Sequence, residues 1–520
     1  MVQSCLAIAS NNPKEAIIIA RNVATESQGN MNVVLIYPNY LESFFVVPSS
    51  FQQNLGLAMI AAAVRNAGHV VTVIDATAER LNIRRLEEKV RHANPDIIGI
   101  SANVSFARKA TITGRWMKIK FSRAKIVFGG PWPTIDYEYL LEKGAAHYVV
   151  IGEGEKTIVE LLKAIENGMS LTEVDGIAFM DGDKVYKTNP RALIDDLDAL
   201  PFPAWDLFPP PRKYFSNVKG KRFYPISTSR GCPFGCIFCS KMVHGYKIRT
   251  RSIENVITEL KYLKKNFDMD EVIFTDDNLN FYIDRAEQLC DAILNLDFKF
   301  SMAFFNGLRA DRLPPRLAWK LSQAGTYDVS LGIECGNQAL VYKIGKNLNL
   351  DAVRAAVKLL KRLKIYITGF FTIGLPGETI QSLLETKQFA LELDADFSDF
   401  FKVIPFPGTR LYHIIQERGK FLIDMRENMS FYNVSKPTYE FNDLPHELVD
   451  LAIRDMNKSF YLRPRKILAF IARMRLKNIR WQVNFLLVIF NSIFSRKEAK
   501  PRPDLKKYIV SKILNHDLAR

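Results

Sequence analysis

The chain has 520 residues, of which 48% are hydrophobic and 24% charged. This composition is typical of globular proteins and excludes overall disorder, and the length corresponds to about three domains. The formal net charge of +16 is concentrated in residues 461–520, which hold 15 Lys or Arg and three acids, so it does not mark the whole chain as nucleic-acid binding. Three of the six cysteines fall within eight residues, which favours a metal site over a disulfide framework.

Residues 1–30 lack the basic start and long apolar run of a secretory signal, so we expect a cytoplasmic protein. From residue 31, short apolar runs alternate with amphipathic stretches, as in MNVVLIYP, GLAMIAAAVRNAG, HVVTVIDA, IRRLEEKVRHANP and DIIGISAN. This alternation predicts βαβ units and a parallel sheet covered on both faces. We therefore predict a Rossmann-like α/β domain over residues 31–170.

A connector and a second α/β unit follow. Residues 171–218 contain a hairpin signal at Asp181-Gly182 and then the proline-rich stretch LPFPAWDLFPPPRKY. In residues 219–424, six strand-like runs alternate with helical periods, which predicts a partial (β/α)6 barrel. Residues 425–520 are predicted to form a basic, largely helical C-terminal region.

The strongest chemical signal is SRGCPFGCIFCSK, which follows the strand-like YPISTS at the start of the second unit. Thiolates are the usual ligands of iron–sulfur clusters, and Cys232, Cys236 and Cys239 can hold three irons of a [4Fe–4S] cubane. The fourth iron then has no protein ligand and can chelate a small molecule. A zinc site is the alternative, and it requires a fourth ligand, for which His244 is available.

This CxxxCxxC pattern, with an aromatic residue before the last cysteine, resembles the radical S-adenosylmethionine (SAM) superfamily, in which the open iron binds SAM. FTDDN, LGIECG and GFFTIGLPGET follow in the order of the superfamily's further motifs. The resemblance implies that Asp277 and Asn278 contact the amino end of SAM and that Glu334 reaches the ribose. It also implies SAM contacts from the aromatic residue and the glycine-rich motif, namely Phe238, Gly374, Pro376 and Gly377. Cys290, in an amphipathic stretch, is predicted to be a buried structural thiol, and Cys335 is assigned no chemistry.

Residues 31–170 resemble the cobalamin-binding domain that precedes the barrel in one large branch of this superfamily. The segments that carry the resemblance are GLAMIAAAVRNAG, PDIIGISA, KIVFGGPWPT and VVIGEGE, and the absence of GxGxxG disfavours a dinucleotide site. The usual DxHxxG motif is missing at Asp75, which implies cobalamin without a histidine on cobalt. A degenerate domain that no longer binds cobalamin is the alternative. The contacts implied for cobalamin come from Ser101, Gly129, Gly130, Gly152, Glu153 and Gly154.

The layout, including WDLFPPPRKY and FYLRPRKIL, resembles the group that contains hopanoid and bacteriochlorophyll methylases and the anaerobic magnesium-protoporphyrin ester cyclase. It implies a [4Fe–4S] cluster, SAM and cobalamin as cofactors and a flavodoxin- or ferredoxin-type electron donor. We expect a methyltransferase that uses a 5′-deoxyadenosyl radical and methylcobalamin to methylate an unactivated carbon of a small, lipophilic substrate such as a terpenoid or tetrapyrrole. A radical cyclase or oxidoreductase of the ester-cyclase type is the alternative.

The basic tail is interleaved with apolar residues from Trp481 to Phe494. This pattern favours peripheral contact with an anionic surface such as the inner membrane, and no nucleic-acid partner is expected. The apolar run 483–493 is shorter than the ~20 residues of a spanning helix. Helices that merely cap the barrel are the alternative. A zinc adaptor or a redox-sensing cluster protein would not need two large α/β domains or an acid at Glu334.

Overall fold

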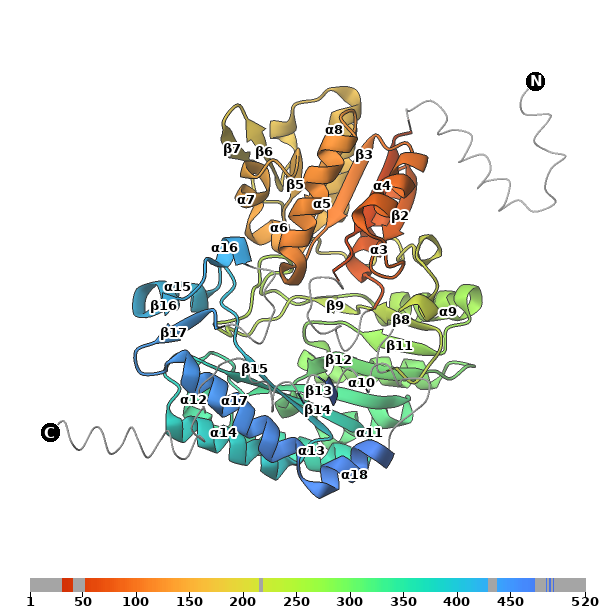
Figure 1. Cartoon of the computed structure of the whole chain (residues 1–520). Helices are drawn as coiled ribbons and strands as arrows, with labels where there is room; N and C mark the ends of the chain where they lie inside the picture. The colour runs from red at the N-terminus through yellow and green to blue at the C-terminus, as the bar shows by residue number, and fades with distance from the viewer. Residues whose placement is uncertain are drawn as a thin grey trace.

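The computed structural model describes residues 30–40, 52–214, 218–428 and 437–472, together with the helical residues 483, 486, 487 and 490. Two α/β units lie one above the other in Figure 1, the N-terminal unit at the top and the second unit below it. The expectations for residues 1–29 and most of those for the basic tail lie outside the described residues.

The N-terminal unit is built on a seven-stranded sheet in the order β2-β1-β3-β4-β5-β6-β7. Strands β1 to β5 are parallel, and β6 and β7 are antiparallel additions at one edge. The strands are β1 (Asn32–Tyr37), β2 (Val70–Asp75), β3 (Ile97–Ser101), β4 (Lys125–Gly129), β5 (Tyr148–Val150), β6 (Ile177–Asp181) and β7 (Lys184–Lys187). The predicted Rossmann-like architecture is confirmed.

Helices cover both faces of this sheet, which explains the near-continuous apolar strands. The helices are α3 (Leu55–Asn66), α4 (Ile83–His92), α5 (Ala107–Lys120), α6 (Pro131–Ile135), α7 (Tyr137–Glu142) and α8 (Gly154–Asn167). Helices α3 and α8 share one core with alternate residues of β1, while α4, α5 and α7 pack on the opposite face. Helix α3 begins where Asn54 accepts a hydrogen bond from the Leu57 amide (2.7 Å).

The hairpin that was placed in the connector belongs to this sheet. Strand β6 pairs antiparallel with β5, so the sheet continues to residue 187, past the predicted domain boundary at residue 170. The physical reason is that β5 would otherwise leave an unpaired edge, which the following hairpin covers. Sequence periodicity identifies a hairpin but does not show which strand it joins.

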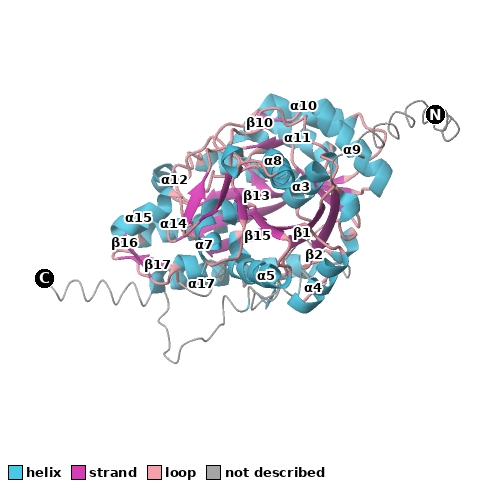
Figure 2. Ribbon diagram, turned by 90° about the horizontal axis from the view of Figure 1, so that it is seen from above, coloured by secondary structure: helices cyan, strands magenta, loops and turns pink. Residues whose placement is uncertain are grey.

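The second unit is a six-stranded, all-parallel sheet in the order β15-β14-β13-β12-β11-β8. Its strands are β8 (Phe223–Ile226), β11 (Glu271–Phe274), β12 (Ser301–Leu308), β13 (Thr326–Glu334), β14 (Tyr366–Ile373) and β15 (Phe397–Lys402). Helices lie outside the strands in Figure 2 and are α9 (Ile253–Phe267), α10 (Ile283–Leu294), α11 (Pro315–Gln323), α12 (Gln338–Lys343), α13 (Leu350–Arg362) and α14 (Ile380–Leu393). The predicted partial (β/α)6 barrel is confirmed, with β8 and β15 as its two edges.

The C-terminal region is less uniformly helical than predicted. After α15 (Arg410–Arg418), strand β16 (Gly419–Phe421) pairs antiparallel with β17 (Tyr439–Phe441), and α16 (Met425–Asn428) lies between them in the chain. Helices α17 (His446–Tyr461) and α18 (Pro464–Ala472) follow, and α17 packs on β15. Three-residue strands carry too little periodicity to be read from sequence.

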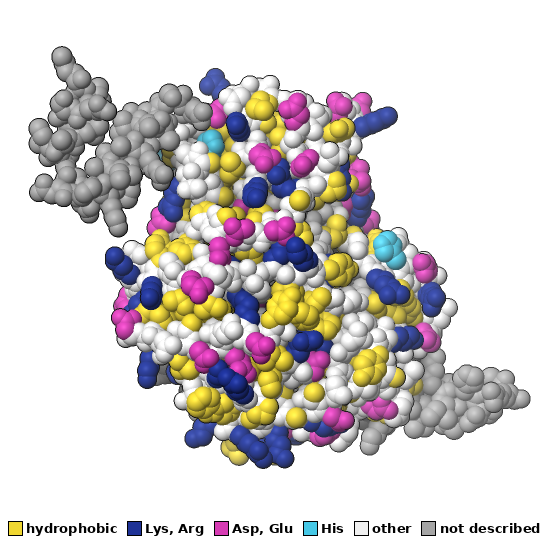
Figure 3. Space-filling model, turned by 180° about the vertical axis from the view of Figure 1, so that it is seen from behind, with side chains coloured by type: hydrophobic (Ala, Val, Ile, Leu, Met, Phe, Trp, Pro, Cys, Tyr) yellow, Lys and Arg dark blue, Asp and Glu magenta, His cyan; other side chains and the backbone are white. Residues whose placement is uncertain are grey.

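Two surface properties bear on partners. Within the described part of the chain, no helix combines the length and the hydropathy needed to cross a membrane. On the face shown in Figure 3, acidic and basic side chains are interspersed, so the positive charge of the chain is not gathered there into a single patch.

Candidate active site

The three cysteines lie in a loop whose two ends are tied together. Strand β9 (Ser229–Arg230) pairs antiparallel with β10 (Arg249–Thr250), which closes the loop 231–248 at the carboxyl end of β8. Inside the loop, the Cys239 amide donates to the Cys236 carbonyl (3.2 Å), and the Ile237 amide donates to the Ile344 carbonyl (3.0 Å). The loop is therefore folded and packed against the segment that follows α12.

The spacing of the thiols fits a cluster better than a single metal ion. Cys232 and Cys236 are half-buried and Cys239 is exposed, and none of the three is in a disulfide. Their Sγ atoms are not all within 4.8 Å of one another, whereas tetrahedral zinc would bring thiolates to roughly 3.8 Å. His244, the suggested fourth zinc ligand, instead has its Nδ1 atom 3.1 Å from a carboxylate oxygen of Glu153. A cubane spreads its thiolates more widely than a single zinc ion does, so it does not require the three sulfur atoms to be this close.

The acidic loop after β11 holds the start of the cysteine loop. Asp277 Oδ2 accepts a hydrogen bond from the Gly231 amide (2.9 Å). Asn278 is buried, and its Nδ2 atom lies 3.9 Å from Cys232 Sγ. The Asn278 Oδ1 atom has no hydrogen-bond partner among the described residues, and a buried acceptor of this kind calls for a donor. The amino group of SAM is such a donor, so this side chain fits the cofactor.

Asp276 is a residue of this loop that the sequence did not single out. Its carboxylate accepts hydrogen bonds from the Thr228 amide (3.1 Å), Thr228 Oγ1 (2.7 Å) and Ser229 Oγ (2.6 Å). Burial raises the pKa of Asp276, and these hydrogen bonds oppose the shift. Asp276 thereby ties the end of β11 to the start of the cysteine loop.

Glu334 occupies the last position of β13 with a φ of 71°, a backbone conformation that is uncommon for a residue other than glycine. Its carboxylate lies 2.9 Å from Lys346 Nζ and accepts a hydrogen bond from Thr372 Oγ1 (2.5 Å). Burial lowers the pKa of Lys346. The negative charges of Glu334 and Cys236 raise it by more, so the pKa of Lys346 lies above its ordinary value. Lys346 was missed from the sequence, although it connects the predicted ribose acid with a cluster cysteine.

The glycine-rich motif after β14 forms a tight turn. Gly374 and Gly377 have φ values of 97° and 80°, which favour glycine. The Gly374 amide donates to Glu378 Oε2 (2.6 Å), and Tyr439 Oη donates to the Gly374 carbonyl. Burial raises the pKa of Glu378 to about 8. Pro376 is half-buried, Gly377 is exposed, and Phe238 packs against the main core.

A cavity of about 360 Å³ lies between the two units. The residues implied for cobalamin all line it: Ser101, Gly129, Gly130, Gly152, Glu153 and Gly154. Its other walls come from the connector, with Leu197 and Phe202, and from the barrel, with Ser227 and Thr275. The carboxyl ends of strands from both sheets therefore face one space, as expected for a cofactor site in an α/β protein.

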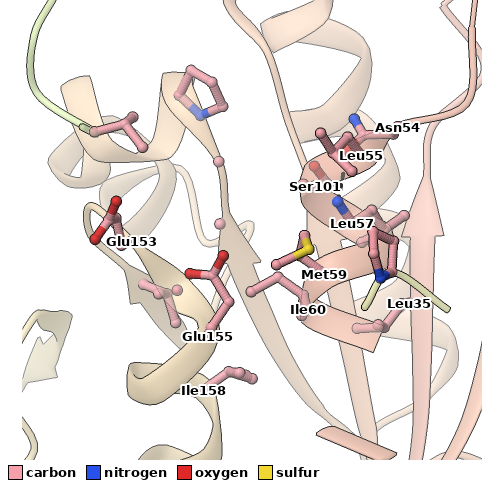
Figure 4. A pocket seen from close by; sticks show the side chains of 18 of the residues that line it. Leu35, Asn54, Leu55, Leu57, Met59, Ile60, Ser101, Glu153, Glu155 and Ile158 are labelled. Carbon is pink, nitrogen blue, oxygen red and sulfur yellow. Dashed lines mark hydrogen bonds between the residues drawn. The ribbon is translucent and has the colours of Figure 1, made fainter. Parts of the chain in front are cut away.

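The glycines leave room that a side chain would take. Among the described residues, a Cβ atom added at Gly152 would meet no atom within 4 Å, and one at Gly129 would meet only Val150 Cβ at 3.8 Å. In Figure 4, apolar side chains of α3, including Met59 and Ile60, lie across the cavity from Glu153 and Glu155. This cradle of glycines and apolar side chains fits a large flat cofactor.

Two acidic side chains at the carboxyl edge of the N-terminal sheet already have hydrogen-bond or ion-pair partners within the protein. Asp75 is buried and accepts hydrogen bonds from Tyr214 Oη (2.8 Å) and the Ala78 amide (2.9 Å), and burial raises its pKa to about 6. Glu153 lines the cavity, but its carboxylate is bound by Arg230 and Arg249 of the barrel unit. A cobalamin contact through Glu153 stays a prediction, although its carboxylate already forms these ion pairs.

Comparison with known proteins agrees with this geometry. The B12 binding domain family matches residues 46–162, and the Radical SAM superfamily matches residues 226–390. An uncharacterized methyltransferase of Pyrococcus horikoshii is 31% identical over 440 residues, which cover 84% of this chain and 94% of that protein. The chain belongs to the cobalamin-dependent radical SAM enzymes. The cofactors of this family are a [4Fe–4S] cluster, SAM and cobalamin.

Other relatives of this radical SAM enzyme include the anaerobic magnesium-protoporphyrin IX monomethyl ester cyclase of Rubrivivax gelatinosus, 27% identical over 84% of this chain and 79% of that protein. Among solved structures, OxsB aligns with a TM-score of 0.69 and 17% identity, covering 94% of this chain and 75% of that one. The methyltransferase TsrM from Kitasatospora setae aligns with a TM-score of 0.65 and 17% identity, covering 88% and 98%. These structures share the fold.

Proposed function

We propose that this enzyme is a C-methyltransferase that acts on an unactivated carbon of a small, lipophilic molecule. The observation that carries the proposal is the cavity between the units, because it is lined both by the glycine edge of the B12-binding sheet and by Ser227 and Thr275 at the carboxyl ends of β8 and β11. When bound, the family's cofactors supply a radical that removes hydrogen and a methyl group that replaces it. The chain's task is to hold these groups in line and keep water away.

The residues divide this task between them. Cys232, Cys236 and Cys239 would hold the cluster. The unpartnered Oδ1 of Asn278 would accept the amino group of SAM, and Glu334, already fixed by Lys346 and Thr372, would accept ribose hydroxyls. Such prior fixation of the acceptor lowers the cost of binding.

The lipophilic character of the substrate is inferred from the inner face of the barrel. Residues opposite one another in register share a face, so Asp399 lies beside Phe370, and Phe401 lies beside Thr372, which contacts Glu334. The Phe370 and Phe401 rings are 6.3 Å apart, and burial raises the pKa of Asp399 to about 6. An aromatic wall with one carboxyl group suits a largely apolar molecule with a hydrogen-bonding group, such as a terpenoid or a tetrapyrrole.

Product mass distinguishes this function from its alternative. The enzyme is purified anaerobically, supplied with hydroxocobalamin, SAM and a chemical reductant, and incubated with terpenoid and tetrapyrrole candidates. With a methyltransferase, the product is heavier than the substrate by one methylene unit. A change by oxygen and hydrogen alone would favour the cyclase reaction named for the Rubrivivax relative, and SAM cleavage without any altered product from these classes would count against the lipophilic assignment.

The cellular setting is part of the same proposal. We place the enzyme in the cytoplasm, reduced by a flavodoxin or ferredoxin and in peripheral contact with the inner membrane through its basic tail. Val483, Leu486, Leu487 and Phe490 are helical, recur at the spacing of one helix face and are 44–58% exposed. Flotation with anionic liposomes tests the contact, which deletion of residues 465–500 should abolish.

A further inference from the structure

Glu153 is the point at which the B12-binding unit and the cysteine loop meet. Its two carboxylate oxygens receive both terminal nitrogens of Arg249, each at 2.8 Å. Arg230 Nη1 lies 3.2 Å away and His244 Nδ1 3.1 Å away, and the Ile194 amide donates at 2.8 Å. Hydrogen bonds from His244 and Arg249 outweigh the effect of burial and hold the pKa of Glu153 well below its ordinary value.

The donors are distributed over the whole cysteine loop. Arg230 and Arg249 are a register pair of the β9–β10 ladder, which closes the loop at both ends, and His244 lies within it. Glu153 itself stands between Gly152 and Gly154, at the start of α8 and at the edge of the cavity. The Glu153 carboxylate therefore binds both ends of the cysteine loop, through Arg230 and Arg249, and its interior, through His244.

The energetics favour a geometric role for this contact. Glu153 and Arg249 are 5% and 3% exposed, and a buried ion pair is often no better for stability than apolar residues of similar size. A bidentate arginine–carboxylate contact does impose distance and orientation. With an apolar contact in its place, the loop could shift by about an ångström relative to the B12-binding unit. A misplacement of that size can reduce the reaction rate about 10²-fold.

We propose that Glu153 is a positioning residue that fixes the cysteine loop, and with it the cluster, relative to the corrinoid. The assignment rests on the proposed function, because it takes both cofactors to be bound. Glu153 acts through Arg249 and Arg230 and touches neither the substrate nor the reacting atoms. Its neighbour Glu155 reinforces the contact through Arg230.

The test uses the full chain and two readouts that do not depend on turnover. In the reduced enzyme, pulsed dipolar EPR gives the distance distribution between cob(II)alamin and the [4Fe–4S]⁺ cluster. In the cofactor-free enzyme, hydrogen–deuterium exchange reports the protection of residues 231–248. Glu153→Gln keeps the size of the side chain and removes its charge. Glu160→Gln, on the same helix and paired with Arg191, is the matched control.

We expect Glu153→Gln to retain iron and cobalamin while the cluster–cobalt distribution broadens and exchange in the loop accelerates about tenfold or more, as for the loss of one hydrogen bond to a charged group. Glu160→Gln should match the unsubstituted enzyme. If Glu153→Gln does not fold, the double variant Glu153→Gln/Arg249→Met removes both charges together and takes its place. An unchanged distance distribution together with unchanged exchange overturns the proposal. An unsubstituted enzyme that binds no cobalamin would overturn the proposed function instead, and the exchange readout would still decide the role of Glu153.

Discussion

The carboxylate of Glu334 lies 2.9 Å from the ammonium nitrogen of Lys346, and the two side chains are 8% and 14% exposed. Lys346 also interacts electrostatically with Cys236. The pair therefore links the acid implied for the SAM ribose with the cysteine loop, and SAM would bind beside an existing ion pair.

Lys346→Met should weaken both folding and SAM binding. Among the described residues, the substitution leaves the buried Glu334 carboxylate with Thr372 as its one donor, and breaking a buried pair costs roughly 3–5 kcal/mol. Urea unfolding and equilibrium dialysis of SAM measure the two effects. Lys358→Met, at an exposed position of α13, is the control. If the two variants had the same stability and the same affinity for SAM, the Glu334–Lys346 pair would have no part in the SAM site.

Replacement of a cluster cysteine should differ sharply from replacement of a structural one. Cys239→Ala removes one of three ligands, so iron content should fall and release of 5′-deoxyadenosine should be lost. Cys290 is buried in α10, and burial raises its pKa to about 12, so Cys290→Ala should keep both properties. Iron analysis and chromatography of the nucleoside decide the outcome, and intact SAM cleavage in Cys239→Ala would contradict the assignment.

Glu378 should make stability depend on pH. Burial raises its folded-state pKa from 4.5 to about 8, so between these values the folded protein keeps a proton that the unfolded chain loses. Stability contributed by this proton is fully present below pH 4.5 and falls by about 1.4 kcal/mol per pH unit as the pH rises toward 8. Glu378→Gln should flatten this slope in urea unfolding between pH 5 and 8; an identical slope in both proteins would show that Glu378 is ionised in the fold.

Gly129→Val should block cobalamin without disturbing the cluster. The new Cβ would meet only Val150 Cβ among the described residues, at 3.8 Å, so the backbone tolerates it, and we expect the methyl groups to take up space in the cavity that Gly129 lines. Overlap with a ligand costs roughly 1–3 kcal/mol, and cobalamin affinity should fall about tenfold or more. Spectroscopic titration with hydroxocobalamin measures the loss. Gly144→Asn, at an open left-handed position before β5, should bind normally, and normal binding by Gly129→Val would place the corrinoid elsewhere.

The strands of the two sheets and the cysteine loop were predictable because their signals are local. Each strand of the barrel is a short apolar run followed by a helical period, and Cys232, Cys236 and Cys239 lie within one turn-rich segment. The glycines of the cavity edge could be named for the same reason, although their contacts with cobalamin remain proposals.

The ionic contacts could not be predicted because their partners are remote. Glu153 is 77 residues from Arg230 and 96 from Arg249, and no periodicity connects such positions. Lys346 follows Glu334 by 12 residues, but α12 lies between them and makes the lysine look like an ordinary surface charge. The pairing of β6 with β5 could not be predicted for the same reason, because it depends on which edge of the folded sheet is free to accept another strand.

The short ladder between β9 and β10 has a consequence for the assembly of the cluster. Because backbone pairing alone holds the two ends of the thiol-bearing segment together, little chain entropy remains to be lost when iron and sulfide bind. Assembly of the metal centre then completes a scaffold that folding has prepared, and we expect protein isolated in air to regain its cluster under reducing conditions without passing through an unfolded state.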